Sequence, residues 1–97
     1  MSAKGYVHAV VTVTEQAGYD RYRAGVAATV EAYGGRFLVR GGAPDVREGN
    51  RPVAHTVILE FPSIDQAKAW YDGPEYAALK ALRMASATTD LVLLTGA

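Results

Sequence analysis

The sequence predicts an α+β fold in which strands and helices follow in the order β-α-β-β-α-β. Two observations support this prediction. Short apolar runs typical of strands occur four times, and the segments after the first and third runs carry apolar residues every three or four positions. A chain of 97 residues is long enough for one hydrophobic core and too short for two. We therefore expect residues 1–97 to form one ferredoxin-like domain with a four-stranded antiparallel sheet.

The first strand and the first helix follow one another near the N-terminus. Residues 6–13 are rich in valine, which favours a strand. Thr14 is a suitable N-cap for the next helix, and two glycines after Tyr33 provide a left-handed stop. The apolar residues of this helix recur on one face: Tyr19, Tyr22, Val26, Val30 and Tyr33.

The second and third strands are predicted to be joined by a long loop. Residues 36–40 and 53–61 have the composition of strands, and Pro62 ends the third because proline cannot donate a ladder hydrogen bond. Residues 43–52 contain two prolines, a glycine and four charged residues. This segment is long for a hairpin connection, and such loops are often functional or mobile; the sequence leaves open whether it closes over a ligand.

The C-terminal half begins with a clear helix signal. The Ser-Ile-Asp-Gln sequence at 63–66 matches a capping box, in which the Ser and Gln side chains each bond a free backbone amide. A helix should therefore begin at Ile64 and end at Asp72. Pro74 suits the first turn of another helix, and residues 88–95 are expected to form the fourth strand.

The third and fourth strands are apolar on both faces. Val57, Leu59 and Phe61 alternate with Ile58, and the last strand carries Leu or Val on either side. Helices cover only one face of a ferredoxin-like sheet. If the second face were exposed to solvent, its residues would be polar. We therefore expect a homodimer in which two sheets enclose a barrel-like space.

Composition excludes several classes of partner and site. Ten basic residues balance ten acidic ones, so net charge draws the protein neither to nucleic acid nor to an anionic membrane. The absence of cysteine excludes disulfides, thiolate metal sites and cysteine nucleophiles. The apolar runs are much shorter than the ~20 residues that span a bilayer. No secretion signal is recognised, and a cytoplasmic location is expected.

An ordered set of short motifs extends over nearly the whole chain. They are Gly35-Arg36-Phe37-Leu38-Val39-Arg40-Gly41-Gly42, Glu48-Gly49, Glu60-Phe61-Pro62-Ser63, Ala69-Trp70-Tyr71, Pro74-Glu75-Tyr76 and Arg83. In this combination the sequence resembles a family of short bacterial proteins, number 1330 of the domains of unknown function. The resemblance implies a dimeric α+β barrel, the fold of antibiotic-biosynthesis monooxygenases, muconolactone isomerases and small haem-degrading enzymes. It implies no reaction. Arg51 and His55 stand where family members usually carry Trp and Arg, which suggests a modified pocket.

Strand alternation gathers polar residues on the face away from the helices. Tyr6, His8 and Thr12 share that face of the first strand, and Glu60 is expected on the same face of the neighbouring third strand. Arg40 is expected to reach Glu60 from the second strand. The catalytic candidates are therefore His8 as proton acceptor or donor, Glu60 as its orienting group or as a base, and Arg40 as the ligand of an anionic or carbonyl oxygen.

The ligand-binding candidates are Tyr6, Thr12, His55 and Trp70. His55 is expected at the start of its strand, near solvent, where a surface or capping role competes with ligand binding. For Trp70, packing in the core is the competing interpretation. Neither histidine has the spacing of a metal site, so no metal and no cofactor are expected. A haem bound through His8 or His55 is an alternative.

Two functional hypotheses follow. The first is a cofactor-independent enzyme or auxiliary factor that binds a small aromatic or polyketide-like molecule in the barrel. The alternative is a non-catalytic dimeric module, either metabolite-binding or structural. In that module, His8, Arg40 and Glu60 hold the interface together, because buried charges must be paired whether or not they catalyse.

Overall fold

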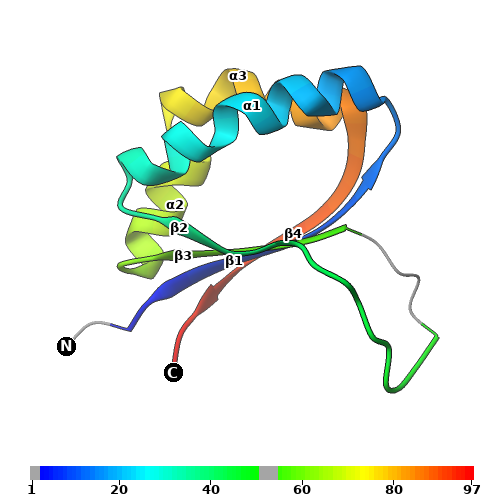
Figure 1. Cartoon of the computed structure of the whole chain (residues 1–97). Helices are drawn as coiled ribbons and strands as arrows, with labels where there is room; N and C mark the ends of the chain where they lie inside the picture. Colours follow the sequence, from blue (N-terminus) through cyan, green and yellow to red (C-terminus); the bar gives the residue numbers. More distant parts are fainter. Residues whose placement is uncertain (1–2, 51–54) are drawn as a thin grey trace.

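The computed structural model describes residues 3–50 and 55–97. Its elements are β1 (Gly5–Val13), α1 (Gln16–Ala32), β2 (Arg36–Gly41), β3 (His55–Phe61), α2 (Ile64–Asp72), α3 (Pro74–Ser86) and β4 (Ala87–Thr95). The strands form one antiparallel sheet in the order β2-β3-β1-β4, and the helices cover one of its faces (Figure 1). This confirms the predicted ferredoxin-like α+β fold.

The helix ends agree with the predictions in position and differ in detail. Glu15, not Thr14, is the N-cap of α1, and its side chain accepts a hydrogen bond from Gly18 N. Thr14 N instead donates to Ser86 O at 2.8 Å. Ser63 caps α2 as expected, accepting from Gln66 N at 3.1 Å. The Gln66 side chain donates to Tyr33 O rather than reaching back to Ser63, so it ties the start of α2 to the end of α1.

An extra residue in β2 changes which side chains share a face. Phe37 pairs with Leu59 and Val39 with Ile58, so Leu38 has no counterpart in β3. Such a bulge shifts the alternation by one residue. Arg40 consequently lies opposite Val57, on the helix side of the sheet.

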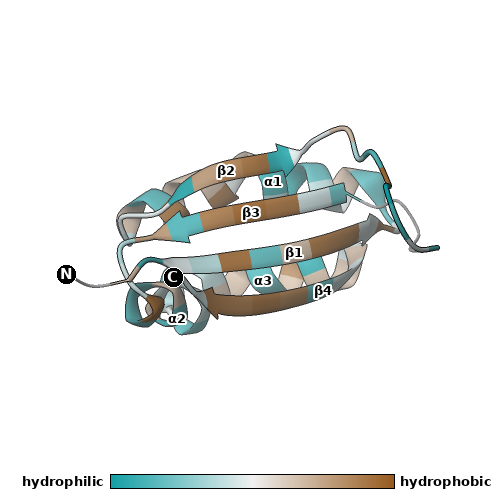
Figure 2. Ribbon diagram, turned by 90° about the horizontal axis from the view of Figure 1, so that it is seen from below, coloured by the Kyte–Doolittle hydropathy of each residue, from teal (hydrophilic) through white to brown (hydrophobic). Residues whose placement is uncertain are grey.

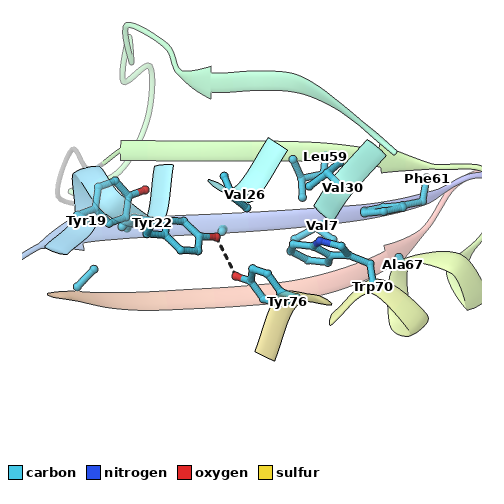
Figure 3. Packing of buried hydrophobic residues seen from close by; sticks show 13 residues of the cluster. Val7, Tyr19, Tyr22, Val26, Val30, Leu59, Phe61, Ala67, Trp70 and Tyr76 are labelled. Atoms are coloured by element: carbon cyan, nitrogen blue, oxygen red, sulfur yellow. Dashed lines mark hydrogen bonds between the residues drawn. The ribbon is translucent and has the colours of Figure 1, made fainter. Parts of the chain in front are cut away.

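The core lies between the helices and this face of the sheet. Its largest fully buried side chains are aromatic, and the rings of Trp70 and Tyr76 lie 4.2 Å apart between centroids (Figure 3). Trp70 Nε1 donates to Thr29 Oγ1 at 3.0 Å, which satisfies its one polar atom. Trp70 is thus a core residue, although one side of it also borders the cavity described below.

The opposite face of the sheet carries no helix. Among the described residues, Leu38, Val92 and Leu94 expose 44%, 49% and 51% of their surface. Figure 2 views the sheet from this side, and all four strands contain residues coloured as apolar. The start of the predicted third strand, at 53–54, lies outside the described residues, and residues 43–50 form neither helix nor strand. No helix among the described residues is long and apolar enough to cross a membrane.

Candidate functional site

A cavity lies between α1, α3 and the helix side of the sheet. Its inner wall is aliphatic, built from alternate residues of β1 and β3 such as Val7, Ala9 and Leu59. The hollow measures about 470 Å³ with its open mouth included. The centre of a water molecule can occupy about 30 Å³ of it, which is room for about two waters.

One wall of the cavity holds a chain of three polar groups. The hydroxyls of Tyr22 and Tyr76 lie 2.8 Å apart (Figure 3), and Arg83 Nε donates to Tyr76 Oη at 3.2 Å. Arg83 is only 4% exposed. Burial, reinforced by Tyr76, raises the pKa of Tyr22 well above its ordinary value of 10.0. The Tyr22 phenol therefore stays protonated at neutral pH, and Arg83 supplies the positive charge of this group.

The mouth of the cavity is also basic. Arg40 lies over the Phe37 ring at 4.4 Å and donates from Nη2 to Arg23 O at 3.1 Å. The His55 ring meets Tyr19 edge-on, with centroids 6.2 Å apart. Burial, together with repulsion from Arg23 and Arg40, lowers the pKa of His55 below 6.5. The imidazole is therefore neutral at pH 7 and able to accept a proton.

The cavity as a whole is suited to an anion. Arg23, Arg40 and Arg83 line it together with His55, and none of the described residues in its lining is acidic. Guanidinium groups are strong, geometrically selective partners for carboxylate and other oxyanions. A phenolate, enolate or carboxylate placed here meets positive charge on two sides.

The residues predicted for the site lie on opposite faces of the sheet. Tyr6, His8 and Thr12 of β1 alternate with its buried residues, so they face away from the helices, as does Glu60 of β3. Arg40, His55 and Trp70 line the cavity on the other side. The predicted set therefore does not form one site.

The expected meeting of Arg40 with Glu60 is wrong. The partners of Glu60 are Arg36 Nε at 3.0 Å and Tyr6 Oη, also at 3.0 Å. The register of β2 on β3 is the reason: Arg36 lies directly opposite Glu60, whereas Arg40 lies opposite Val57, and the bulge at Leu38 also turns Arg40 to the helix side. His8 pairs with Ile58, two positions from Glu60 along β3.

His55 was expected near solvent and is instead partly buried at the cavity. Tyr22, Tyr76 and Arg83 were not predicted as site residues. A signal for Arg83 exists in the sequence: Tyr76, Leu79 and Arg83 follow one another at helical spacing, so a charge falls on the apolar face of its helix. A buried charge of this kind needs a partner, and it marks a candidate site.

Comparison with known proteins identifies the family. The model of a family described as "Domain of unknown function (DUF1330)" matches residues 4–97. The chain belongs to this family. No curated protein matches it. Its DUF1330 membership confirms the resemblance seen in the sequence.

Solved structures show the same fold at low sequence identity. A protein of unknown function from Rhodopseudomonas palustris is 17% identical, with TM-score 0.80 over 100% of this chain and 85% of that one. SnoaB, a cofactor-independent oxygenase from Streptomyces nogalater, is 18% identical, with TM-score 0.70 over 99% and 95%. A dimeric ferredoxin-like protein of unknown function from Thermobifida fusca is 12% identical, with TM-score 0.65 over 98% and 92%.

Proposed function

We propose that this DUF1330 protein binds a small acidic aromatic molecule, phenolic or polyketide-like, in the cavity between the helices and the sheet, and acts on it without a cofactor. The observation that carries the proposal is the lining: three arginines, a neutral histidine and a buried tyrosine, with no acidic residue among the described ones. The fold shared with a cofactor-independent oxygenase supports the enzyme-like role.

The residues supply acid-base chemistry. His55 takes the proton of a phenolic hydroxyl, which leaves an electron-rich phenolate beside Arg40. The Tyr22 hydroxyl donates to a second oxygen of the ligand, and Arg83 supports it through Tyr76. Positive charge on both sides stabilises the anion, and the aliphatic wall keeps water from it.

An aromatic ring enters only if the mouth opens, because the empty cavity has room for about two waters. Arg23 and Arg40 line the cavity and are both exposed, and the Arg40 side chain donates a hydrogen bond to the backbone carbonyl of Arg23. Their side chains can swing outward without disturbing the core. An anionic ligand compensates for the lost contact by pairing with Arg40.

The experiment compares acids with neutral analogues of the same shape. 1-Naphthol and 1-naphthoate should raise the melting temperature, since a ligand at 100 times its Kd stabilises by about 2.7 kcal/mol, whereas methyl 1-naphthoate should have little effect. His55→Gln should weaken the 1-naphthol response, and His8→Gln, on the other face, should leave it unchanged. Equal responses to acid and ester, or a loss caused by His8→Gln alone, would contradict the proposal. Oxygen consumption with hydroxynaphthalenes then tests for turnover.

A second candidate function rests on the other face. Tyr6, Glu60 and Arg36 form a hydrogen-bonded group there, next to exposed apolar residues. This arrangement favours a homodimer in which the group lies at the interface between two sheets. His8 and Thr12 would then line the barrel between the copies. If ligand stabilisation depends on His8 and not on His55, the ligand binds in the barrel.

A further inference from the structure

A second hollow opens between α3 and the edge strand β4. Its lining is Tyr71, Arg83, Met84, Ala87, Thr89 and Leu91. The centre of a water molecule can occupy about 210 Å³ of it, far more than in the cavity under α1. The two spaces share Arg83 and Leu91, so Arg83 stands between them.

Two residues that line this hollow each carry a buried side-chain polar atom without a hydrogen-bond partner. These atoms are Arg83 Nη2 and Thr89 Oγ1, and the described residues contain no other buried side-chain nitrogen or oxygen in that state. Native proteins pair nearly all such atoms, because an unpaired buried donor loses its hydration without compensation. The two residues that carry these atoms both line this hollow. A ligand in this space would satisfy both.

The chemistry of the two atoms defines the ligand. Arg83 Nη2 is a charged donor with no acceptor capacity, and the Thr89 hydroxyl is also free to donate. A carboxylate offers one oxygen to each. None of the described residues that line the hollow is acidic, and Lys80 adds positive charge nearby. Its Nζ lies 4.2 Å from the Tyr71 ring centroid and donates to Tyr71 O at 3.1 Å.

We propose that this hollow is a separate binding site for a monocarboxylic acid with a small apolar body. The carboxylate accepts hydrogen bonds from Arg83 and Thr89, and the body packs against Met84, Leu91 and the Tyr71 ring. Met84 is 61% exposed and leaves the site open to solvent. The hollow lies on the helix side of the sheet, away from the face expected to meet a second copy. The site does not depend on the ligand of the first cavity.

The test uses benzoate and its neutral isostere benzamide, titrated at constant ionic strength and followed by calorimetry and amide chemical shifts. We expect benzoate to bind, with shifts concentrated in residues 83–91, and benzamide to bind at least about tenfold more weakly. Thr89→Val removes one hydroxyl at nearly constant shape and should weaken benzoate about tenfold. It should not lower the melting temperature of the free protein, because that hydroxyl is unpaired there.

Thr88→Val is the matched control, since Thr88 is exposed on the opposite face of the same strand. It should leave benzoate affinity at this hollow unchanged. His55→Gln acts on the first cavity and should leave the benzoate shifts of Met84, Ala87 and Thr89, which line only the second hollow, unchanged. The proposal is overturned if benzoate and benzamide bind alike, if benzoate does not bind, or if Thr88→Val and Thr89→Val behave alike. It is also overturned if benzoate affinity falls as the protein associates, which would assign Arg83 to a carboxylate of a second copy.

Discussion

At the scale of single residues, His55 lies where burial and two guanidinium groups act in the same direction. All three lower its pKa relative to the unfolded value of 6.5. The unfolded chain therefore binds more protons than the folded chain between the folded pKa and pH 6.5. Stability must rise with pH through that window, and the contribution of His55 is constant above it.

We expect His55→Gln to remove this dependence. Urea unfolding between pH 5 and 8 should show the wild type losing stability below pH 6.5 and the variant losing less. His8→Gln is the control, because His8 lies on the other face of the sheet. A bound anion should reverse the effect: it favours the imidazolium, so binding of 1-naphthoate should take up protons near pH 6. Identical pH profiles for the wild type and His55→Gln would contradict the assignment.

Glu60 is a second residue whose neighbours fix its charge. The hydrogen bond from Tyr6, followed by that from Arg36, lowers its pKa below 4.5. A lowered carboxyl pKa stabilises the fold above pH 4.5, and this contribution is lost as the pH falls through the folded pKa. Glu60→Gln should therefore lower the urea midpoint at pH 7. The variant should also lose less stability than the wild type as the pH falls below 4.5.

The control for Glu60→Gln is Asp45→Asn, which breaks the exposed Arg47 ion pair and should change little. Ligand stabilisation should survive Glu60→Gln if the ligand binds on the helix side. Loss of ligand binding with unchanged stability would instead support the barrel site.

At the scale of elements, alternation and capping signals predict most of the secondary structure. They fail where the position of a residue depends on how its element packs against a neighbouring one. Alternation puts His8 and Glu60 on the correct face because β1 and this end of β3 pair without interruption. It assigns Arg40 to the wrong face because the bulge at Leu38 depends on how β2 pairs with β3, and no local sequence pattern predicts this bulge. Gln66 likewise bonds α1 rather than its own helix end.

Ser63 tests the part of the capping signal that is confirmed. Ser63→Ala removes the acceptor of Gln66 N and should cost about 1 kcal/mol of unfolding free energy. Ser63→Thr keeps the oxygen and should cost much less. Urea unfolding measures both. Equal losses in the two variants would mean that packing around Ser63, rather than the cap, is what matters.

At the scale of the whole molecule, helix spacing and strand alternation are sufficient to predict a sheet with helices on one side. They do not predict the cavities, because these depend on how α1 and α3 pack against the sheet. Arg83, Tyr22 and His55 lie far apart in the sequence and meet only in the folded chain. The cavity is thus a tertiary feature, whereas the apolar second face of the sheet is visible in the strands themselves.

That second face should hold the molecule together as a dimer. Val92 and Leu94 of β4 expose about half their surface there, and burying them against a second sheet removes apolar area from water. Light scattering at micromolar concentration should give twice the 10.3 kDa of one chain. Val92→Asp should shift the protein towards monomer, because a charge would then be buried without a partner. Val46→Asp is the matched control, since Val46 is equally exposed, at 49%, in the loop after β2. A wild-type mass of one chain, or equal dissociation by both variants, would show that another surface, or none, mediates association.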